Sequence, residues 1–180
     1  MASRLLAKTG DESRVSMREV AAAAGVTPPA IYLHFADKAE LMVAVCQREF
    51  GAFDRFVEAA IASIEDPVER LRERGRAYVR FGIEHPEQYR ILFMDRTMPL
   101  PMPAMDAATG FGHLVANVEE AIASGGLAPG DPLVMSSGLW AVVHGITSLT
   151  IAVPGFPVVG LETLVEHLLD VQLRGLRSAG

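Results

Sequence analysis

The sequence predicts an all-helical protein of about nine helices, and three observations lead to that prediction. Apolar residues recur at helical spacing along most of the 180 residues, and no alternating apolar–polar run of strand type stands out. Capping residues precede these stretches, and glycines or prolines follow them. Hydrophobic residues make up 50% of the chain, enough to bury a sizeable core, which excludes global disorder.

Charge and cysteine content narrow the class of protein. The 16 Lys and Arg against 22 Asp and Glu give a net charge of -6, which excludes a wholly basic nucleic-acid-binding surface but permits a local one. The single cysteine, Cys46, lies on an apolar stripe and is expected to be buried. One cysteine excludes an internal disulfide and fits a reducing, cytoplasmic compartment. The histidines show no metal-binding spacing, so we predict no metal and no cofactor.

The first compact unit is expected between Ser16 and Phe35. Ser16 and Glu19 form a capping box that starts a helix, and Gly25 ends it. Thr27 is expected to cap a second, short helix that runs to about Phe35, with two prolines in its first turn. Two short helices across a glycine turn are typical of a helix-turn-helix, which places its second helix in the major groove of DNA.

The outward-facing residues of this unit suit DNA. Arginine can read guanine, whereas Tyr, His and Lys side chains and a helix N-terminus can hold phosphates, and Pro or Ala can contact thymine methyl groups. The alternative for each side chain is an ordinary polar helix surface. The predicted DNA contacts are Ser16, Arg18, Thr27, Pro28, Pro29, Ala30, Tyr32, His34 and Lys38.

Longer helices are expected to follow, each with its own start. Aspartates cap three of them, at Asp37, at Asp66 and at Asp131. No charged residue occurs from Pro132 to Leu161, but the acidic flanks, Asp131 and Glu162, favour a buried helix of a soluble protein over a membrane span. The proline-rich segment 98–103 is expected to be a loop. The expected helical ranges are 37–64, 66–84, 86–93, 104–125, 131–152 and 161–176.

Aromatic residues and methionines of this second part could line a pocket for an apolar or amphipathic ligand, because methionine adapts to irregular shapes. Simple core packing is the alternative for each of them. His113, His144 or Tyr89 could hold a polar group of the ligand. The predicted pocket residues are Tyr78, Tyr89, Phe93, Met94, Met98, Met102, Met105, Phe111, Trp140 and His144.

Five arginines lie at even-numbered positions between residues 70 and 80. Successive even positions point around a helix rather than along one side, and glutamates intervene. A solvated helix face with ion pairs is therefore expected at Arg70, Arg72, Arg74, Arg76 and Arg80.

The motifs resemble those of the TetR family of bacterial one-component regulators. SMREVA at 16–21, AGVT at 24–27 and IYLHF at 31–35 followed by Asp37-Lys38 resemble its DNA-binding helices. HPEQYRILF at 85–93 resembles the segment that opens its ligand-binding domain. WAVVHG at 140–145 resembles the Trp-His-Gly signature of one C-terminal subgroup.

This resemblance implies an organisation and a function. Residues 1–45 are expected to form a three-helix DNA-binding domain, and residues 46–180 an effector-binding and dimerisation domain. The resemblance implies a homodimer that pairs through residues 131–152 and 160–177. It also implies a repressor that a small molecule releases from palindromic operator DNA. The acidic flanks of the uncharged segment, considered above, predict no membrane partner.

Two rival functions remain open. One is a ligand-binding protein or adaptor that has lost DNA affinity, suggested by the short stretch before Gly10. The other is a small helical enzyme that uses the pocket. No phosphate loop, G-x-S-x-G motif or Cys–His pair is recognisable, so we predict that the protein is not an enzyme.

Overall fold

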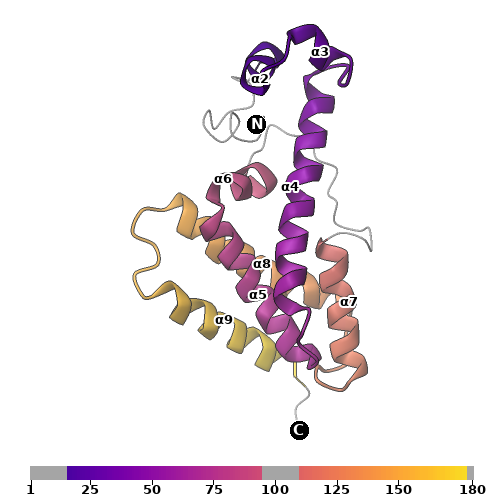
Figure 1. Cartoon of the computed structure of the whole chain (residues 1–180). Coiled ribbons are helices and arrows are strands. Elements are labelled where there is room, and N and C mark those ends of the chain that lie inside the picture. Colours follow the sequence, from indigo (N-terminus) through magenta and orange to yellow (C-terminus); the bar gives the residue numbers. More distant parts are fainter. Residues whose placement is uncertain (1–15, 95–109, 178–180) are drawn as a thin grey trace. The chain divides into compact units, whose positions relative to one another are not determined.

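A computed structural model describes residues 16–94 and 110–177 (Figure 1). These residues form eight α-helices and one π-helical turn, and none of them lies in a strand, which confirms the predicted all-helical fold for this part of the chain. The proposed loop at 98–103 and the expected helix start at Ala104 lie outside the described residues. The elements are α2 (Met17–Ala24), α3 (Pro28–Tyr32), α4 (Lys38–Ile61), α5 (Pro67–Glu84), α6 (Pro86–Tyr89), the π-helical turn η2 (Arg90–Met94), α7 (Gly110–Ala123), α8 (Pro132–Ala152) and α9 (Leu161–Gly175).

Acidic side chains accept hydrogen bonds from the exposed N–H groups at three helix starts, as their positions predict. The backbone N–H of Glu40 donates to Asp37 Oδ1 over 2.9 Å, and that of Glu69 donates to Asp66 Oδ1 over 2.8 Å. At the start of α8, Asp131 Oδ1 accepts from the N–H of Leu133 over 2.8 Å. These contacts satisfy donors that have no partner inside the helix and so fix where each helix begins.

The chain folds into two compact units, and the division falls inside α4, after Ala52. The first unit contains α2, α3, the N-terminal part of α4, α6 and η2. Its core combines residues of α2, α3 and α4 with one residue of η2. Cys46 is fully buried there, as expected. The core residues are Met17, Val20, Ala21, Ile31, Leu41, Met42, Val45, Cys46 and Ile91.

The second unit contains the C-terminal part of α4 with α5, α7, α8 and α9. Helix α5 packs against α7, α8 and α9, so it is the centre of this unit. A core cluster joins all four of these helices through Val68, Leu71, Val118, Ala121, Leu127, Leu139 and Leu173. The glycine at position 75 allows the close approach of α9, because a Cβ there would lie 2.5 Å from Leu169 Cδ2.

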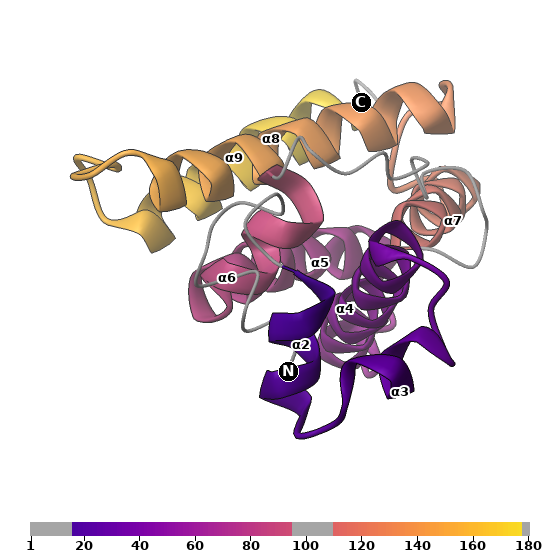
Figure 2. The ribbon, with the colours of Figure 1, turned by 90° about the horizontal axis from the view of Figure 1, so that it is seen from above.

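Helices α8 and α9 lie side by side at the surface of the second unit (Figure 2). Helix α8 is long and apolar enough to cross a membrane by length and composition alone, and 28% of its most apolar window is buried. Its buried face, which includes Leu139, Val143 and Ile146, packs within the second unit. Much of an apolar helix therefore remains exposed on this face of the unit.

Candidate functional site

The helix-turn-helix of the first unit is built by local contacts. The N–H of Glu19 donates to Ser16 Oγ over 3.2 Å, and the N–H of Ser16 donates to Glu19 Oε2 over 2.8 Å, which completes the predicted capping box. The hydrogen bonds from Ser16 lower the pKa of Glu19. Gly25 has a φ of 70°, in the left-handed region, and the N–H of Val26 donates to the carbonyl of Ala21 over 3.0 Å. This turn sets the angle between α2 and α3.

The predicted DNA contacts lie on the surface of this unit. Val20, Ala21 and Ile31 hold the two helices together from the inside. The side chains of Arg18, His34 and Tyr32 are exposed, and Tyr32 keeps 54% of its surface accessible. Of the others, Ser16, Thr27 and Pro29 are exposed and Pro28, Ala30 and Lys38 are half-buried. Contact with DNA stays a prediction for all nine.

Of two local expectations for α3, the N-cap position is confirmed without its side-chain hydrogen bond, and the position of the helix end is wrong. Thr27 occupies the N-cap position, but its side chain makes no capping hydrogen bond. The helix ends at Tyr32 rather than near Phe35, where the chain turns so that both His34 and Phe35 donate to the carbonyl of Ile31. This turn leaves Leu33 84% exposed. Sequence reasoning missed Leu33, although its place between the inward-facing Ile31 and Phe35 indicates an outward side chain.

A polar network links α5 to α8 in the second unit. Trp140 Nε1 donates to the Tyr78 hydroxyl over 3.2 Å, and that hydroxyl lies 3.2 Å from His144 Nδ1. His144 Nε2 lies 3.3 Å from Ser148 Oγ. Phe111 of α7 packs edge-on against Trp140, with ring centroids 5.8 Å apart. The structure thus brings together four predicted pocket residues from three helices.

The donors and acceptors of this network are compatible with the following arrangement of hydrogens. Trp140 Nε1 can only donate, so the Tyr78 oxygen accepts from it, and in this arrangement the Tyr78 hydrogen goes to His144 Nδ1. Nε2 then carries the imidazole hydrogen, which points to Ser148 Oγ. Burial lowers the pKa of His144, so the neutral form that this arrangement needs is favoured.

The other predicted pocket residues fall elsewhere. Tyr89 and Phe93 lie in the first unit, where their ring centroids are 4.9 Å apart, and Tyr89 is fully buried. Met94 is half-buried in the same unit. Met98, Met102 and Met105 lie outside the described residues. The pocket as a single site of ten residues therefore stays a prediction.

The arginines of α5 form interhelical ion pairs. Arg72 Nη2 lies 3.0 Å from Asp170 Oδ1 of α9, and Arg70 pairs with Glu120 of α7. The prediction of an ion-paired, solvated face is wrong for Arg74, whose surface is 6% exposed. Its Nη2 atom donates to Glu58 Oε1 over 2.6 Å and its Nε atom to Asn117 Oδ1 over 2.8 Å. This arginine is buried because it joins α5 to α4 and α7.

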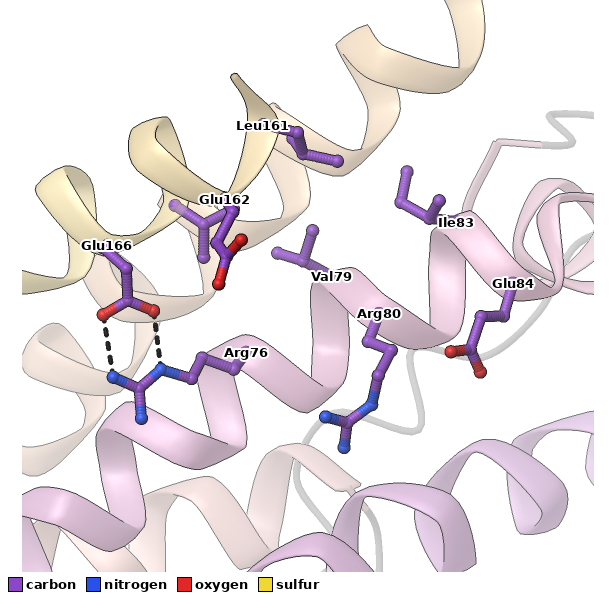
Figure 3. A pocket seen from close by; sticks show the side chains of 9 residues that line it. Arg76, Val79, Arg80, Ile83, Glu84, Leu161, Glu162 and Glu166 are labelled. Atoms are coloured by element: carbon purple, nitrogen blue, oxygen red, sulfur yellow. Dashed lines mark hydrogen bonds and ion pairs between the residues drawn. The ribbon is translucent and has the colours of Figure 1, made fainter.

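An open groove of about 510 Å³ runs between α5 and α9 (Figure 3). Its apolar wall includes Val79 and Val165, and a bidentate ion pair closes one end. Arg76 donates to the two carboxylate oxygens of Glu166 over 2.6 and 2.7 Å, and these hydrogen bonds lower the pKa of Glu166. None of the ten predicted pocket residues lines this groove. The ion pair between Arg76 and Glu166 holds α9 against α5.

A second titratable cluster lies between α4 and α7. His113 Nδ1 is 3.0 Å from Asp54 Oδ1 and 3.3 Å from Glu58 Oε1. One nitrogen or oxygen of each residue lies within 4.8 Å of the other two. Sequence spacing did not reveal this cluster, because Asp54 and His113 are 59 positions apart.

Comparison with known proteins agrees with this architecture of a helix-turn-helix unit and a helical body. A model of the tetracyclin repressor-like C-terminal domain matches residues 71–175, and a model of bacterial regulatory proteins of the tetR family matches residues 2–45. These features define the class of bacterial helix-turn-helix regulatory proteins. Within that class, the chain belongs to the TetR family.

The individual proteins that this chain resembles share 24–38% sequence identity with it over the aligned residues. The HTH-type transcriptional activator FasR of Mycolicibacterium smegmatis is 38% identical over 89 residues, which cover 49% of this chain and 40% of FasR. The chain thus matches less than half the length of this relative. A protein of unknown function from Rhodococcus sp. RHA1 has a TM-score of 0.74 and 26% identity, covering 98% of this chain and 96% of its own. AibR, solved with isovaleryl coenzyme A and operator DNA, has a TM-score of 0.70 and 24% identity over 94% of this chain and 92% of its own.

Proposed function

We propose that this protein is a cytoplasmic, ligand-responsive transcription regulator that binds operator DNA as a homodimer. The observation that carries the proposal is the capped helix-turn-helix with Arg18, Tyr32 and His34 exposed on it, in a segment that matches the regulatory-protein family. Repression, relieved by the effector, is the proposed direction of control. FasR is named as an activator, so a reporter assay with and without effector must decide the sign.

DNA binding is tested by fluorescence anisotropy against the DNA that flanks the coding region, at two salt concentrations. Phosphate contacts make the affinity fall as salt rises. Arg18→Ala and Tyr32→Phe remove one proposed contact each, and a base-reading arginine contributes about 1–3 kcal/mol, or roughly five- to 150-fold in Kd. Arg55→Ala, at an exposed position of α4 in the second unit, is the charge-matched control and should bind normally. Salt-independent or absent binding would favour the ligand-binding adaptor instead.

The homodimer is proposed to form through α8 and α9. The exposed side of α8 carries small residues at helical spacing, Gly138, Ala141 and Gly145, and a Cβ at either glycine would meet no atom within 4 Å. Val134 and Leu149, four residues before Gly138 and four after Gly145, are 67% and 46% exposed, so a second copy that packs here would bury apolar side chains. A second copy of α8 could approach closely along this surface, as in other pairs of helices with small residues at the contact.

Sedimentation velocity tests this interface. Ala141→Arg places a charge at the centre of the proposed contact and should shift the protein to the monomer, because an unpaired buried charge is costly. Glu119→Arg introduces the same residue at an exposed position of α7 and should leave the oligomeric state unchanged. A dimer that persists in the Ala141 variant would exclude this side of α8 from the interface.

The effector is proposed to contact the network of Tyr78, Trp140 and His144. Aromatic side chains beside a few polar groups suit an amphipathic molecule. The polar atoms of Tyr78 and His144 would hold its polar group, and Phe111 would contact its apolar part. Isovaleryl coenzyme A, the ligand of the similarly folded AibR, is a reasonable first probe because it joins a short acyl chain to a polar nucleotide.

The only tryptophan of the chain is Trp140, so its emission reports on the proposed site directly. An effector should change this emission and release DNA over the same concentration range, because a ligand shifts a conformational equilibrium only by its difference in affinity for the two states. Release of DNA without a change in Trp140 emission would place the effector elsewhere.

A further inference from the structure

We propose that Asp54, Glu58 and His113 form a binding site for a divalent first-row transition-metal ion. The three side chains converge from two helices. Asp54 and Glu58 are four residues apart and thus lie on one side of α4, and His113 faces them from α7. Metal sites between facing helices are commonly built in this way.

The distances between the donor atoms suit one ion. Two ligands that are each about 2.1 Å from an ion, at angles of about 90–110°, lie about 3.0–3.4 Å from one another. His113 Nδ1 is 3.0 Å from Asp54 Oδ1 and 3.3 Å from Glu58 Oε1. The Asp54 and Glu58 oxygens lie within 4.8 Å of one another, so binding requires the two carboxylates to close on the ion and the imidazole to lose any proton.

Arg74 and Asn117 would support the site from outside. Asn117 accepts from Arg74 Nε, and Arg74 Nη2 donates to Glu58 Oε1, so the position of this carboxylate is fixed before an ion arrives. A carboxylate oxygen has two acceptor positions and can hold both the guanidinium and an ion. With a neutral imidazole, two carboxylates and one guanidinium leave a net charge of -1, which attracts a cation. The positive charge of Arg74 also weakens the affinity that two free carboxylates would give.

The ligand types point to a class of metal. One imidazole nitrogen with two carboxylate oxygens suits Zn²⁺, Fe²⁺, Ni²⁺ or Co²⁺ better than Mg²⁺, which prefers oxygen ligands and retains its waters. Three protein ligands leave coordination positions for water. Because α4 and α7 each supply ligands, the ion would tie these two helices together and stabilise the second unit.

The test is isothermal titration of untagged, full-length protein with Zn²⁺, with Co²⁺ used for absorption spectra and Mg²⁺ as the hard-cation comparison. One ion per chain is expected, with Co²⁺ bands that show nitrogen and oxygen ligands and no thiolate. Asp54→Asn and His113→Gln should each weaken binding at least tenfold. Glu119→Gln changes a carboxylate at an exposed position of α7 and should retain it. Circular dichroism checks that every variant is folded.

A second measurement needs only the wild-type chain. Diethyl pyrocarbonate modifies accessible histidines, and mass spectrometry locates the modified residue. Zn²⁺ should protect His113 at least fivefold, whereas the exposed His34 should react equally with and without metal. The proposal is overturned if Zn²⁺ does not bind at millimolar concentration, if it binds equally to the Asp54 and His113 variants, or if His113 stays unprotected. None of these outcomes depends on DNA or effector binding.

Discussion

Replacing Tyr78 with Phe isolates the contribution of the Tyr78 hydroxyl to the polar network. The side chain is 6% exposed, and its ring packs edge-on against Phe53 with centroids 5.3 Å apart, a contact that Phe retains. The variant removes the acceptor for Trp140 Nε1 and the partner of His144 Nδ1. Each lost hydrogen bond between neutral groups costs about 1 kcal/mol when its partner is left without a substitute. Trp140 and His144 are only half-buried, so water can replace part of the loss.

We therefore expect Tyr78→Phe to reduce the free energy of unfolding by about 1–2 kcal/mol and the unfolding temperature by about 2–8 °C. Urea denaturation followed by circular dichroism measures the loss, and Trp140 emission reports the change at the site. Tyr32→Phe is the matched control, since it removes the same hydroxyl from a side chain that is 54% exposed. This control should keep its stability but weaken DNA binding. Equal stability of the two variants would show that the network contributes nothing to folding.

Two further predictions concern the turn at Gly25 in the first unit and the protonation of His144 in the second unit. Gly25→Ala should lower the free energy of unfolding by about 1 kcal/mol, because alanine is strained at the left-handed φ of 70°. No further loss is expected, since the added Cβ meets no atom within 4 Å. Gly125→Ala, at a φ of 77° with equally open surroundings, should cost the same in urea denaturation, and a much larger loss at Gly25 would reveal strain in the helix-turn-helix. Burial lowers the pKa of His144 from its ordinary value of 6.5, so its neutral form stabilises the fold above that pH. This contribution should disappear as the pH falls below about 6.5, and His144→Gln should lose less stability than the wild type over the same pH range.

The sequence was sufficient for features that depend on neighbouring residues. The capping box at Ser16 and Glu19, the left-handed Gly25 and the cap at Asp131 each need only a few adjacent positions, and all are present. Thr27 shows the limit of this reasoning. Its position and φ and ψ angles are those of an N-cap, but its hydroxyl does not reach a backbone donor. A residue type can indicate where a helix begins without determining which hydrogen bond its side chain makes.

Contacts between distant residues were beyond sequence reasoning. Tyr78 and His144 are 66 positions apart, and Arg74 and Asn117 are 43 apart, so no local pattern joins them. Arg74 looked like its neighbours on α5 because helical spacing does not show which side meets another helix. Its burial became evident only once α4 and α7 were placed against α5. For the same reason, histidine spacing gave no indication of the cluster at His113.

The direction of the hydrogen bonds at His144 bears on whether the site binds or catalyses. A serine and a histidine nitrogen 3.3 Å apart could suggest a nucleophile and its base. A base must present an unprotonated nitrogen to the hydroxyl, with the opposite nitrogen donating to an orienting group. In the tautomer in which Nδ1 accepts from Tyr78, Nε2 carries the hydrogen that faces Ser148, and His144 cannot take the serine proton. The Tyr78 oxygen can also accept from Trp140 and from a protonated Nδ1 together, and Nε2 then carries no hydrogen and faces Ser148 as a base would. Nitrogen-15 NMR of His144 distinguishes the two: a hydrogen on Nε2 excludes the base role, and a hydrogen on Nδ1 permits it.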